Sequence, residues 1–210
     1  MGRREPLNRD RVIAAAVALA DEKGSAGVSM RALAGRLGVE AMSLYNHVGG
    51  RDDLLDGMVD AVFGEIALPA SGVEWRTAMR ARAVSARAAL VRHPWAVGLL
   101  DSRGRPGPAT LRHHDSVLGV LRTGGFSVAA AVRAVSLIDS YLYGFVLQEL
   151  SLPFGGRDEL DRVAGDILGS LPAGHPHLAE VIAQRPDVDP AAEFDAGLAL
   201  ILGALAPDEG

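Results

Sequence analysis

The chain of 210 residues contains no cysteine, which excludes disulfide bridges and thiolate metal sites. Lysine is nearly absent too, since Lys23 is the only one and arginine carries the remaining basic charge. Apolar residues make up 49% of the sequence, but charged residues interrupt them, so no run reaches the length of a membrane span. No apolar signal region follows the basic start. We therefore expect a cytoplasmic protein with no membrane partner.

Catalytic motifs are missing as well. The sequence has no Gly-x-Ser-x-Gly elbow, no phosphate loop and no His-Glu-x-x-His, and its glycine-rich pieces fall at expected helix ends. His113 and His114 are neighbours, but adjacent side chains on a helix point about 100° apart, so they cannot easily share one ion. We expect no enzyme activity, no metal and no cofactor.

Charge is distributed unevenly along the chain. The formal net charge is −5, yet residues 1–51 carry +3 and residues 52–210 carry −8. A basic N-terminal part on an acidic remainder suits a polyanionic partner at one end of the molecule and repels it elsewhere.

The N-terminal part predicts two helices with clear ends. Apolar residues recur at helical spacing after Asn8 and again after Ser29, and both residues are good N-caps. Gly24 is expected to end the first helix and Gly38 the second.

A third, shorter helix is expected between Glu40 and His47, before the pair Gly49-Gly50. Two turns are too short to be stable alone, so packing must hold this helix in place. The inward residues are expected to be Val39, Leu44 and Val48. The outward residues are then Ala41, Met42, Ser43, Tyr45 and His47.

The rest of the chain also predicts helices, and no segment alternates like a strand, so we expect an all-α fold. The turn-forming residues 69–72 divide it into an N-terminal domain, 1–68, and a helical domain, 73–206. The expected helices are Arg51–Leu68, Trp75–Arg92, Trp95–Leu100, Ala109–Thr123, Val128–Leu150, Arg157–Ser170, His177–Gln184 and Ala191–Leu205.

A helix, a glycine turn and a short helix with polar and aromatic groups outward form a helix-turn-helix, whose second helix enters the major groove of DNA. Over residues 8–55, and above all in "VEAMSLYNHV" and "RDDLLDGM", the sequence resembles the DNA-binding domain of the tetracycline-repressor family of bacterial transcription regulators. The resemblance implies a homodimeric, ligand-responsive repressor of a palindromic operator in double-stranded DNA.

The resemblance also implies individual DNA contacts. It assigns an operator contact to Arg31, base reading to Ala41, Met42 and Ser43, backbone contacts to Tyr45 and His47, and a phosphate contact to Arg51. Because the first two base-reading residues are small or apolar, thymine methyl contacts and DNA shape must supply much of the specificity.

Each of these residues also has a structural interpretation. Tyr45 could be a half-buried core aromatic, His47 a helix cap and Arg51 a solvated charge. Two other functions stay open: an all-α interaction protein, or an activator built on the same scaffold.

Beyond Trp75 the segments "RHPW", "GRPGPATLRHHDSVLGVLRTGGFS" and "YLYGFVLQE" resemble the family's C-terminal domain. That domain implies dimerisation and a pocket for a small apolar or amphipathic effector. The expected pocket residues, which could equally be plain core, are Trp95, Leu99, His114, Leu118, Tyr141 and Phe145.

Two apolar stripes are candidates for the dimer interface, although both could instead fill the core of one chain. They comprise Val132, Val135, Leu142, Val146 and Leu150, and Phe194, Leu198, Ile201, Leu202 and Leu205. The arginines of the helix that begins at Trp75 are expected to form a solvated face; they are Arg76, Arg80, Arg82, Arg87 and Arg92.

Overall fold

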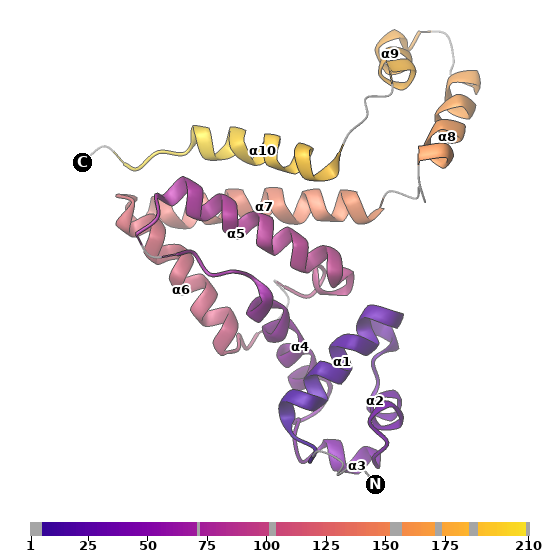
Figure 1. Ribbon diagram of the computed structural model, residues 1–210, viewed down its shortest axis with the longest axis vertical. Helices are drawn as coiled ribbons and strands as arrows, with labels where there is room; N and C mark the ends of the chain where they lie inside the picture. The colour runs from indigo at the N-terminus through magenta and orange to yellow at the C-terminus, as the bar shows by residue number, and fades with distance from the viewer. Residues whose placement is uncertain are drawn as a thin grey trace.

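The structure is a computed structural model that describes residues 6–70, 72–100, 104–151, 157–170, 174–184 and 189–208. These residues form ten α-helices, two short 3₁₀-helices and no β-strand, which confirms the all-α prediction. The N-terminal helices lie at one end of the longest axis, as a head, and the later helices form a larger body (Figure 1).

The head begins with three helices whose ends follow the predicted signals. They are α1 (Arg9–Lys23), α2 (Met30–Leu37) and α3 (Ala41–Leu44), with the 3₁₀-helix η1 (Ser25–Gly27) between the first two. The Asn8 side chain accepts a hydrogen bond from the Arg11 amide, and the Ser29 side chain accepts one from the Ala32 amide. Gly38 ends α2 in the left-handed conformation, with φ 66°. Both caps and this stop are confirmed.

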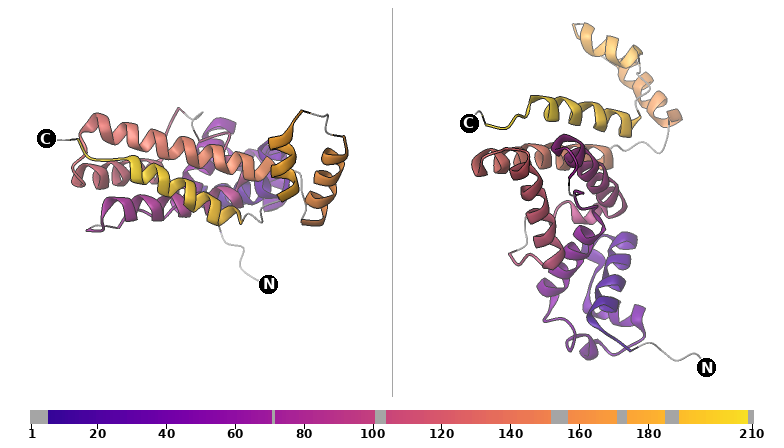
Figure 2. Two further views of the ribbon diagram at one scale, coloured as in Figure 1. Left: turned by 90° about the horizontal axis from the view of Figure 1, so that it is seen from above. Right: turned by 60° about the vertical axis from the view of Figure 1, so that its left-hand side comes forward.

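The remaining helices lie in the body, apart from the first, which the head and the body share. They are α4 (Arg51–Glu65), α5 (Trp75–Arg92), η2 (Pro94–Ala96), α6 (Pro108–Thr123), α7 (Val128–Ser151), α8 (Arg157–Ser170), α9 (Pro176–Gln184) and α10 (Pro190–Ala204). Helices α5, α7 and α10 run side by side, and α6 leads from them towards α4 (Figures 1 and 2). The pair α8 and α9 lies to one side of this group.

Two expected helices are too long. Helix α4 ends at Glu65 and not at Leu68, because the chain becomes extended before Pro69, as residues that precede proline tend to do. The expected helix Trp95–Leu100 is only the 3₁₀-helix η2 followed by a turn. A segment this short makes few helical hydrogen bonds to offset the free-energy cost of nucleating an α-helix.

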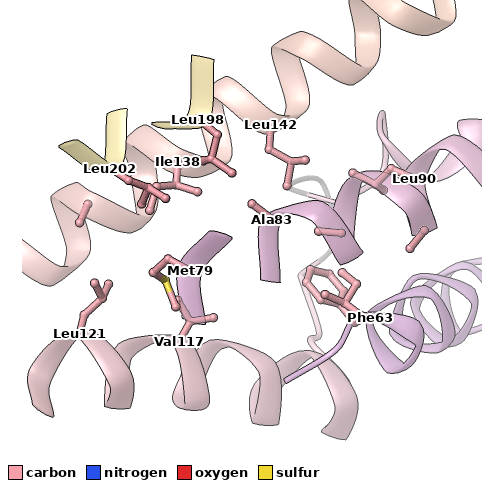
Figure 3. Close-up of a cluster of buried hydrophobic side chains, with 14 of the residues drawn as sticks. Phe63, Met79, Ala83, Leu90, Val117, Leu121, Ile138, Leu142, Leu198 and Leu202 are labelled. Carbon is pink, nitrogen blue, oxygen red and sulfur yellow. The ribbon is translucent and has the colours of Figure 1, made fainter. Parts of the chain in front are cut away.

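Helix α4 belongs to both hydrophobic cores. Its first half, down to Met58, packs in the head with Leu33 and Leu44, and its second half, from Val59, packs in the body. Phe63 of α4 lies in the body cluster beside α5 and α6 (Figure 3). The two cores therefore meet inside α4, between Met58 and Val59, before the turn-forming residues 69–72. The division into domains 1–68 and 73–206 stays a prediction.

Helix α7 is the one described helix that is long and apolar enough to cross a membrane. Its Ile138, Leu142 and Val146 are buried, and the first two lie in the cluster of Figure 3. This placement corrects part of the expected dimer stripes, because the buried members fill the core of one chain: Leu142, Val146, Phe194, Leu198 and Leu202. The apolar spacing predicts a single apolar face on each helix, whereas both α7 and α10 have buried apolar residues and exposed ones.

Candidate DNA-binding head and polar centre of the body

Helix α3 is one α-helical turn, shorter than the two turns expected between Glu40 and His47. It is continued by tighter turns, in which the His47 amide donates to the Leu44 carbonyl oxygen at 2.9 Å. Glu40 provides no side-chain cap. The segment is held instead by burial of Leu44 and Val48 in the head core, as the inward pattern predicted.

The outer face of α3 presents a mixture of apolar and polar groups. Met42 is 75% exposed and Tyr45 49% exposed, whereas Ala41, Ser43 and His47 are half-buried. Arg31 lies exposed near the start of the preceding helix α2. The predicted DNA-contacting residues of α3 thus lie on one short segment whose other side is fixed in the core.

Arg9 is a positioning residue that the sequence reasoning missed. Its guanidinium donates to both carboxylate oxygens of Asp53 at 2.7 Å and to the His47 carbonyl oxygen at 3.2 Å. The Gly49 amide donates to the same carboxylate at 2.8 Å. Together the hydrogen bonds from Arg9 and from this amide lower the pKa of Asp53 to about 2. Helix α1 therefore fixes the end of the α3 segment and the start of α4.

Arg51 binds within the head. Its guanidinium donates to the Val28 carbonyl oxygen at 2.5 Å and to the Ser25 carbonyl oxygen at 3.4 Å. It thereby ties the start of α4 to the segment between α1 and α2. Its contact with a DNA phosphate stays a prediction.

The head and the body meet at a buried histidine. His93 Nδ1 lies 2.7 Å from Asp21 Oδ1 of α1, and its Nε2 lies 3.1 Å from Glu65 Oε1 of α4. Burial raises the pKa of Glu65, but hydrogen bonds from Arg92 and His93 outweigh burial and lower it. Trp95 Nε1 donates to the same Asp21 oxygen at 2.7 Å.

The six predicted pocket residues lie in three neighbourhoods. Trp95 and Leu99 pack at this junction, against both cores. His114 and Leu118 are exposed on α6. The third neighbourhood joins α7 to α10, where the rings of Tyr141, Phe145 and Phe194 lie with centroids 5.2–5.8 Å apart and Tyr141 stacks on Phe194. Among the described residues, no cluster of three or more histidine or acidic side chains is placed to hold a metal ion.

Three of the five arginines of α5 are exposed, as their spacing predicted, but Arg82 and Arg87 are not. Arg82 is 2% exposed and donates through Nε to His113 Nε2 at 3.0 Å and through Nη1 to Asp139 of α7. Arg87 forms a two-point ion pair with Glu149 of α7. These arginines link α5 to α6 and α7 from inside the body, and their partners lie far away in sequence.

His113 completes this buried polar centre. It is fully buried, and burial, followed by the nearby Arg82 and His114, lowers its pKa to about 3. The Phe63 ring of α4 lies 5.3 Å from the His113 ring and 5.5 Å from the His114 ring. Residues of α4, α5, α6 and α7 therefore meet around the pair of His113 and Arg82.

A second link joins α4 to α6. Asp60 of α4 accepts hydrogen bonds from the Thr110 amide and hydroxyl, both at 2.8 Å, at the start of α6. It lies in an open cleft of about 1250 Å³ between the head and the segment before α6. A Cβ atom at Gly107 would lie 2.3 Å from the Asp60 carboxyl carbon, so this approach requires glycine.

A three-helix head with a helix-turn-helix, joined by a shared helix to a helical body, defines the class of DNA-binding regulators with a separate effector domain. Residues 12–58 match the family model for bacterial regulatory proteins of the tetR family, and residues 68–206 match the tetracyclin repressor-like C-terminal domain. The chain therefore belongs to the tetracycline-repressor family of transcriptional regulators. Members of this family bind operator DNA as dimers and bind small-molecule effectors.

Individual relatives are transcriptional regulators as well. An HTH-type transcriptional regulator of Saccharopolyspora erythraea is 41% identical over 144 residues, which cover 68% of this chain and 61% of that protein. The class A tetracycline repressor of Escherichia coli is 32% identical over 95% of this chain and 91% of its own length. Among solved structures, Streptomyces coelicolor ActR with actinorhodin has a TM-score of 0.79 and 29% identity, covering 96% of this chain and 97% of that chain.

Proposed function

We propose that this chain is a ligand-responsive transcriptional repressor that binds a palindromic operator as a homodimer and is released by a small-molecule effector. The observation that carries the proposal is the segment 41–48, where the buried Leu44 of α3 and Val48 of the following turns hold an outer face towards solvent in the most basic part of the chain. The proposal implies a cytoplasmic protein, because a bacterial operator lies in the cytoplasm.

The proposed DNA contacts divide by chemistry. Met42 and Ser43 would face base edges, where Met42 offers an apolar surface to thymine methyl groups and Ser43 a hydroxyl. Tyr45 and Arg31, both exposed, would contact phosphates or groove edges. Ala41, His47 and Arg51 complete the proposed set of DNA contacts. Arg51 would use the guanidinium N–H groups that do not donate to Val28 or Ser25.

A face of α7 and α10 supports the homodimer. Leu137 and Leu147 of α7 and Leu200 of α10 are each more than half exposed; the exposed Gly144 lies between the two α7 leucines, and the exposed Gly203 follows Leu200 by three residues. Seen from above, the two helices lie side by side on the side of the body away from the head (Figure 2). Large apolar residues separated by glycines suit close helix packing, so this face would pair with itself in a second copy.

Helix α4 connects the body, where the effector would bind, to the DNA-binding head. Its first half packs in the head core, while Asp60 and Phe63 contact α6 in the body. A ligand that moves α6 would therefore move the head through α4, and this coupling changes DNA affinity. Suitable test compounds are those bound in related structures, namely actinorhodin, minocycline and 5a,6-anhydrotetracycline with magnesium, which we use as a panel.

The direct test of the function is DNA binding. Fluorescence anisotropy would compare the fragment immediately upstream of the gene with scrambled DNA at two salt concentrations. A specific site should bind roughly 10³-fold or more tightly than scrambled DNA and keep this preference as salt is raised. Equal, salt-sensitive binding to both fragments would contradict a local repressor.

The second candidate is an interaction protein or activator on the same scaffold. The half-buried Ala41 and the apolar Met42 favour it, because neither side chain can donate a hydrogen bond to a base edge. No DNA binding at all would support the interaction protein. Specific DNA binding that persists with every compound that binds the body would support an activator without ligand-induced release.

A further inference from the structure

A histidine side chain at the junction of head and body lies between two carboxylates. His93 is 7% exposed, its Nδ1 lies 2.7 Å from Asp21 Oδ1, and its Nε2 lies 3.1 Å from Glu65 Oε1. Ionised carboxylates only accept hydrogen bonds, and a neutral imidazole has a single N–H group. Only the protonated ring can therefore donate to both carboxylates at once.

Other donors fix both carboxylates as acceptors. Asp21 Oδ1 also accepts a hydrogen bond from Trp95 Nε1 at 2.7 Å, and Glu65 Oε2 accepts one from Arg92 Nη2 at 2.6 Å. Burial opposes the ionisation of Glu65, but hydrogen bonds from Arg92 and His93 outweigh burial, so its pKa is lowered. Neither carboxylate therefore offers His93 a proton to accept.

The charges at this junction balance only when the ring is protonated. Among the described residues, the charged groups around the ring are Asp21 of α1, Glu65 of α4 and Arg92 of α5. One guanidinium and one imidazolium then balance the two carboxylates. A neutral His93 leaves one negative charge uncompensated and turns a nitrogen lone pair towards a carboxylate oxygen, which is unfavourable at a buried site.

The elements that meet here relate the head to the body. Asp21 lies in the last turn of α1, and the end of this head helix approaches the end of α5 in the body (Figure 1). Helix α4 belongs to both cores, and Glu65 is its last residue. A protonated His93 thus ties α1 to the body at a second place, in addition to α4.

We propose that His93 is a pH-sensitive link between the head and the body, in which the imidazolium joins Asp21 of α1 to Glu65 of α4 and loss of its proton releases α1 from this attachment. Histidine is the side chain that ordinarily changes charge between about pH 5 and pH 8. The link is complete at the acidic end of this range and is lost as pH rises.

The consequence for DNA rests on the proposed function. A dimer must place two heads on one palindromic operator. Heads of fixed orientation lose less conformational freedom on binding than loosely attached ones, so they bind more tightly. Operator affinity should therefore fall as pH rises and His93 loses its proton.

The two tryptophans of the chain provide the direct test. In protein with ¹⁵N-labelled tryptophan, each indole N–H gives one resonance, and that of Trp95 is identified by its loss in Trp95→Phe. Between about pH 6 and pH 8 the Trp95 resonance should shift, because its acceptor Asp21 loses the protonated His93. Trp75, at the other end of α5, is the internal control and should stay in place.

Variants separate His93 from other titrating groups. In His93→Gln the pH-dependent shift of the Trp95 resonance should be absent, and in the matched control His114→Gln, at an exposed histidine of α6, it should remain. The comparison of Trp95 with Trp75 needs no variant at His93, so it holds even where His93→Gln fails to fold. A Trp95 resonance that does not move with pH, or that moves equally in His93→Gln, would overturn the link.

Anisotropy on the upstream fragment measures the consequence for DNA. Between about pH 6 and pH 8 the affinity of the unaltered protein should fall about fivefold more than that of His93→Gln, a coupling at the low end of those between distinct sites. This comparison removes the contribution of His47, which lies on the proposed DNA-contacting segment of both proteins. His114→Gln should behave like the unaltered protein. An equal pH dependence in the unaltered protein and His93→Gln would overturn the effect of the link on DNA binding.

Failure of the inference is distinguishable from failure of the function. If the protein binds its operator but the Trp95 resonance does not move with pH, the link is wrong and the regulator remains. If the resonance moves through His93 but no operator is bound at either pH, the repressor proposal is wrong and the link remains.

Discussion

The head and the body use arginine in different ways. In the head, Arg9 and Asp53 form a two-point ion pair in which both side chains are about 40% exposed. In the body, the corresponding pair of Arg82 and Asp139 is 2% and 14% exposed. Solvent screens the first pair, so it contributes little to stability and mainly fixes position. The second is desolvated, so its loss should be costly.

The largest expected effect breaks the buried pair. Asp139→Asn leaves the Arg82 charge inside the body without a counter-charge, and we expect a loss of about 3–5 kcal/mol in the free energy of unfolding. Asp53→Asn in the head is the matched control and should cost about 1 kcal/mol or less. Urea unfolding of both variants measures the difference. Equal losses would show that the two regions do not differ as described.

The next effect is the pH dependence of stability. Folded His113 stays neutral down to a pKa of about 3, whereas in the unfolded chain it takes up a proton below its ordinary pKa of 6.5. Unfolding therefore takes up a proton between these values, and stability falls as pH falls through this range. We expect His113 to account for a loss of about 2 kcal/mol between pH 7 and pH 5.

Urea unfolding at both pH values measures this loss. His113→Gln should reduce the pH dependence by this amount, and His114→Gln should reduce it much less, because burial is the main cause of the lowered pKa of His113. A similar pH dependence in the unaltered protein and His113→Gln would contradict the buried neutral histidine.

A smaller effect concerns the link between α4 and α6. Gly107→Ala would place a methyl group 2.3 Å from the Asp60 carboxyl carbon, so the carboxylate must leave the start of α6. We expect a loss of about 1–3 kcal/mol in stability, as for other overpacked sites, and weaker release of the operator by a bound compound. Gly104→Ala is the matched control, because its Cβ would meet no atom of the described residues within 4 Å. Thermal unfolding temperatures that do not differ between the variants would count against this link.

Local signals in the sequence predicted the helices well, because caps and stops depend on a few neighbouring residues. Asn8, Ser29 and Gly38 act where the pattern placed them. The pattern failed where partners lie far apart in sequence. Arg82 is spaced like its exposed neighbours on α5, and nothing local reveals a bond to His113, 31 residues away. Likewise, the partner of Trp95 is Asp21 of the head, at a junction that periodicity cannot show.

The residues of the candidate DNA-binding site also divide into those that local sequence predicts and those that it does not. The outward residues of α3 could be predicted, because burial of Leu44 and Val48 determines which side remains exposed. The two positioning residues Arg9 and Arg51 could not, since their acceptors are a distant carboxylate and backbone carbonyl oxygens. Backbone acceptors have no sequence signature at all.

The central claim is that the outer face of α3 recognises DNA. The two variants that test it have the smallest expected effect on stability. Tyr45→Ala and Ser43→Ala alter exposed or half-buried groups and should leave unfolding within about 0.5 kcal/mol. The decisive measurement is the anisotropy of both variants on the upstream fragment and on scrambled DNA. We predict that Tyr45→Ala weakens binding to both fragments alike, because backbone contacts are largely independent of sequence, and that Ser43→Ala lowers the preference for the upstream fragment. Unchanged affinities of both variants on both fragments would contradict the claim.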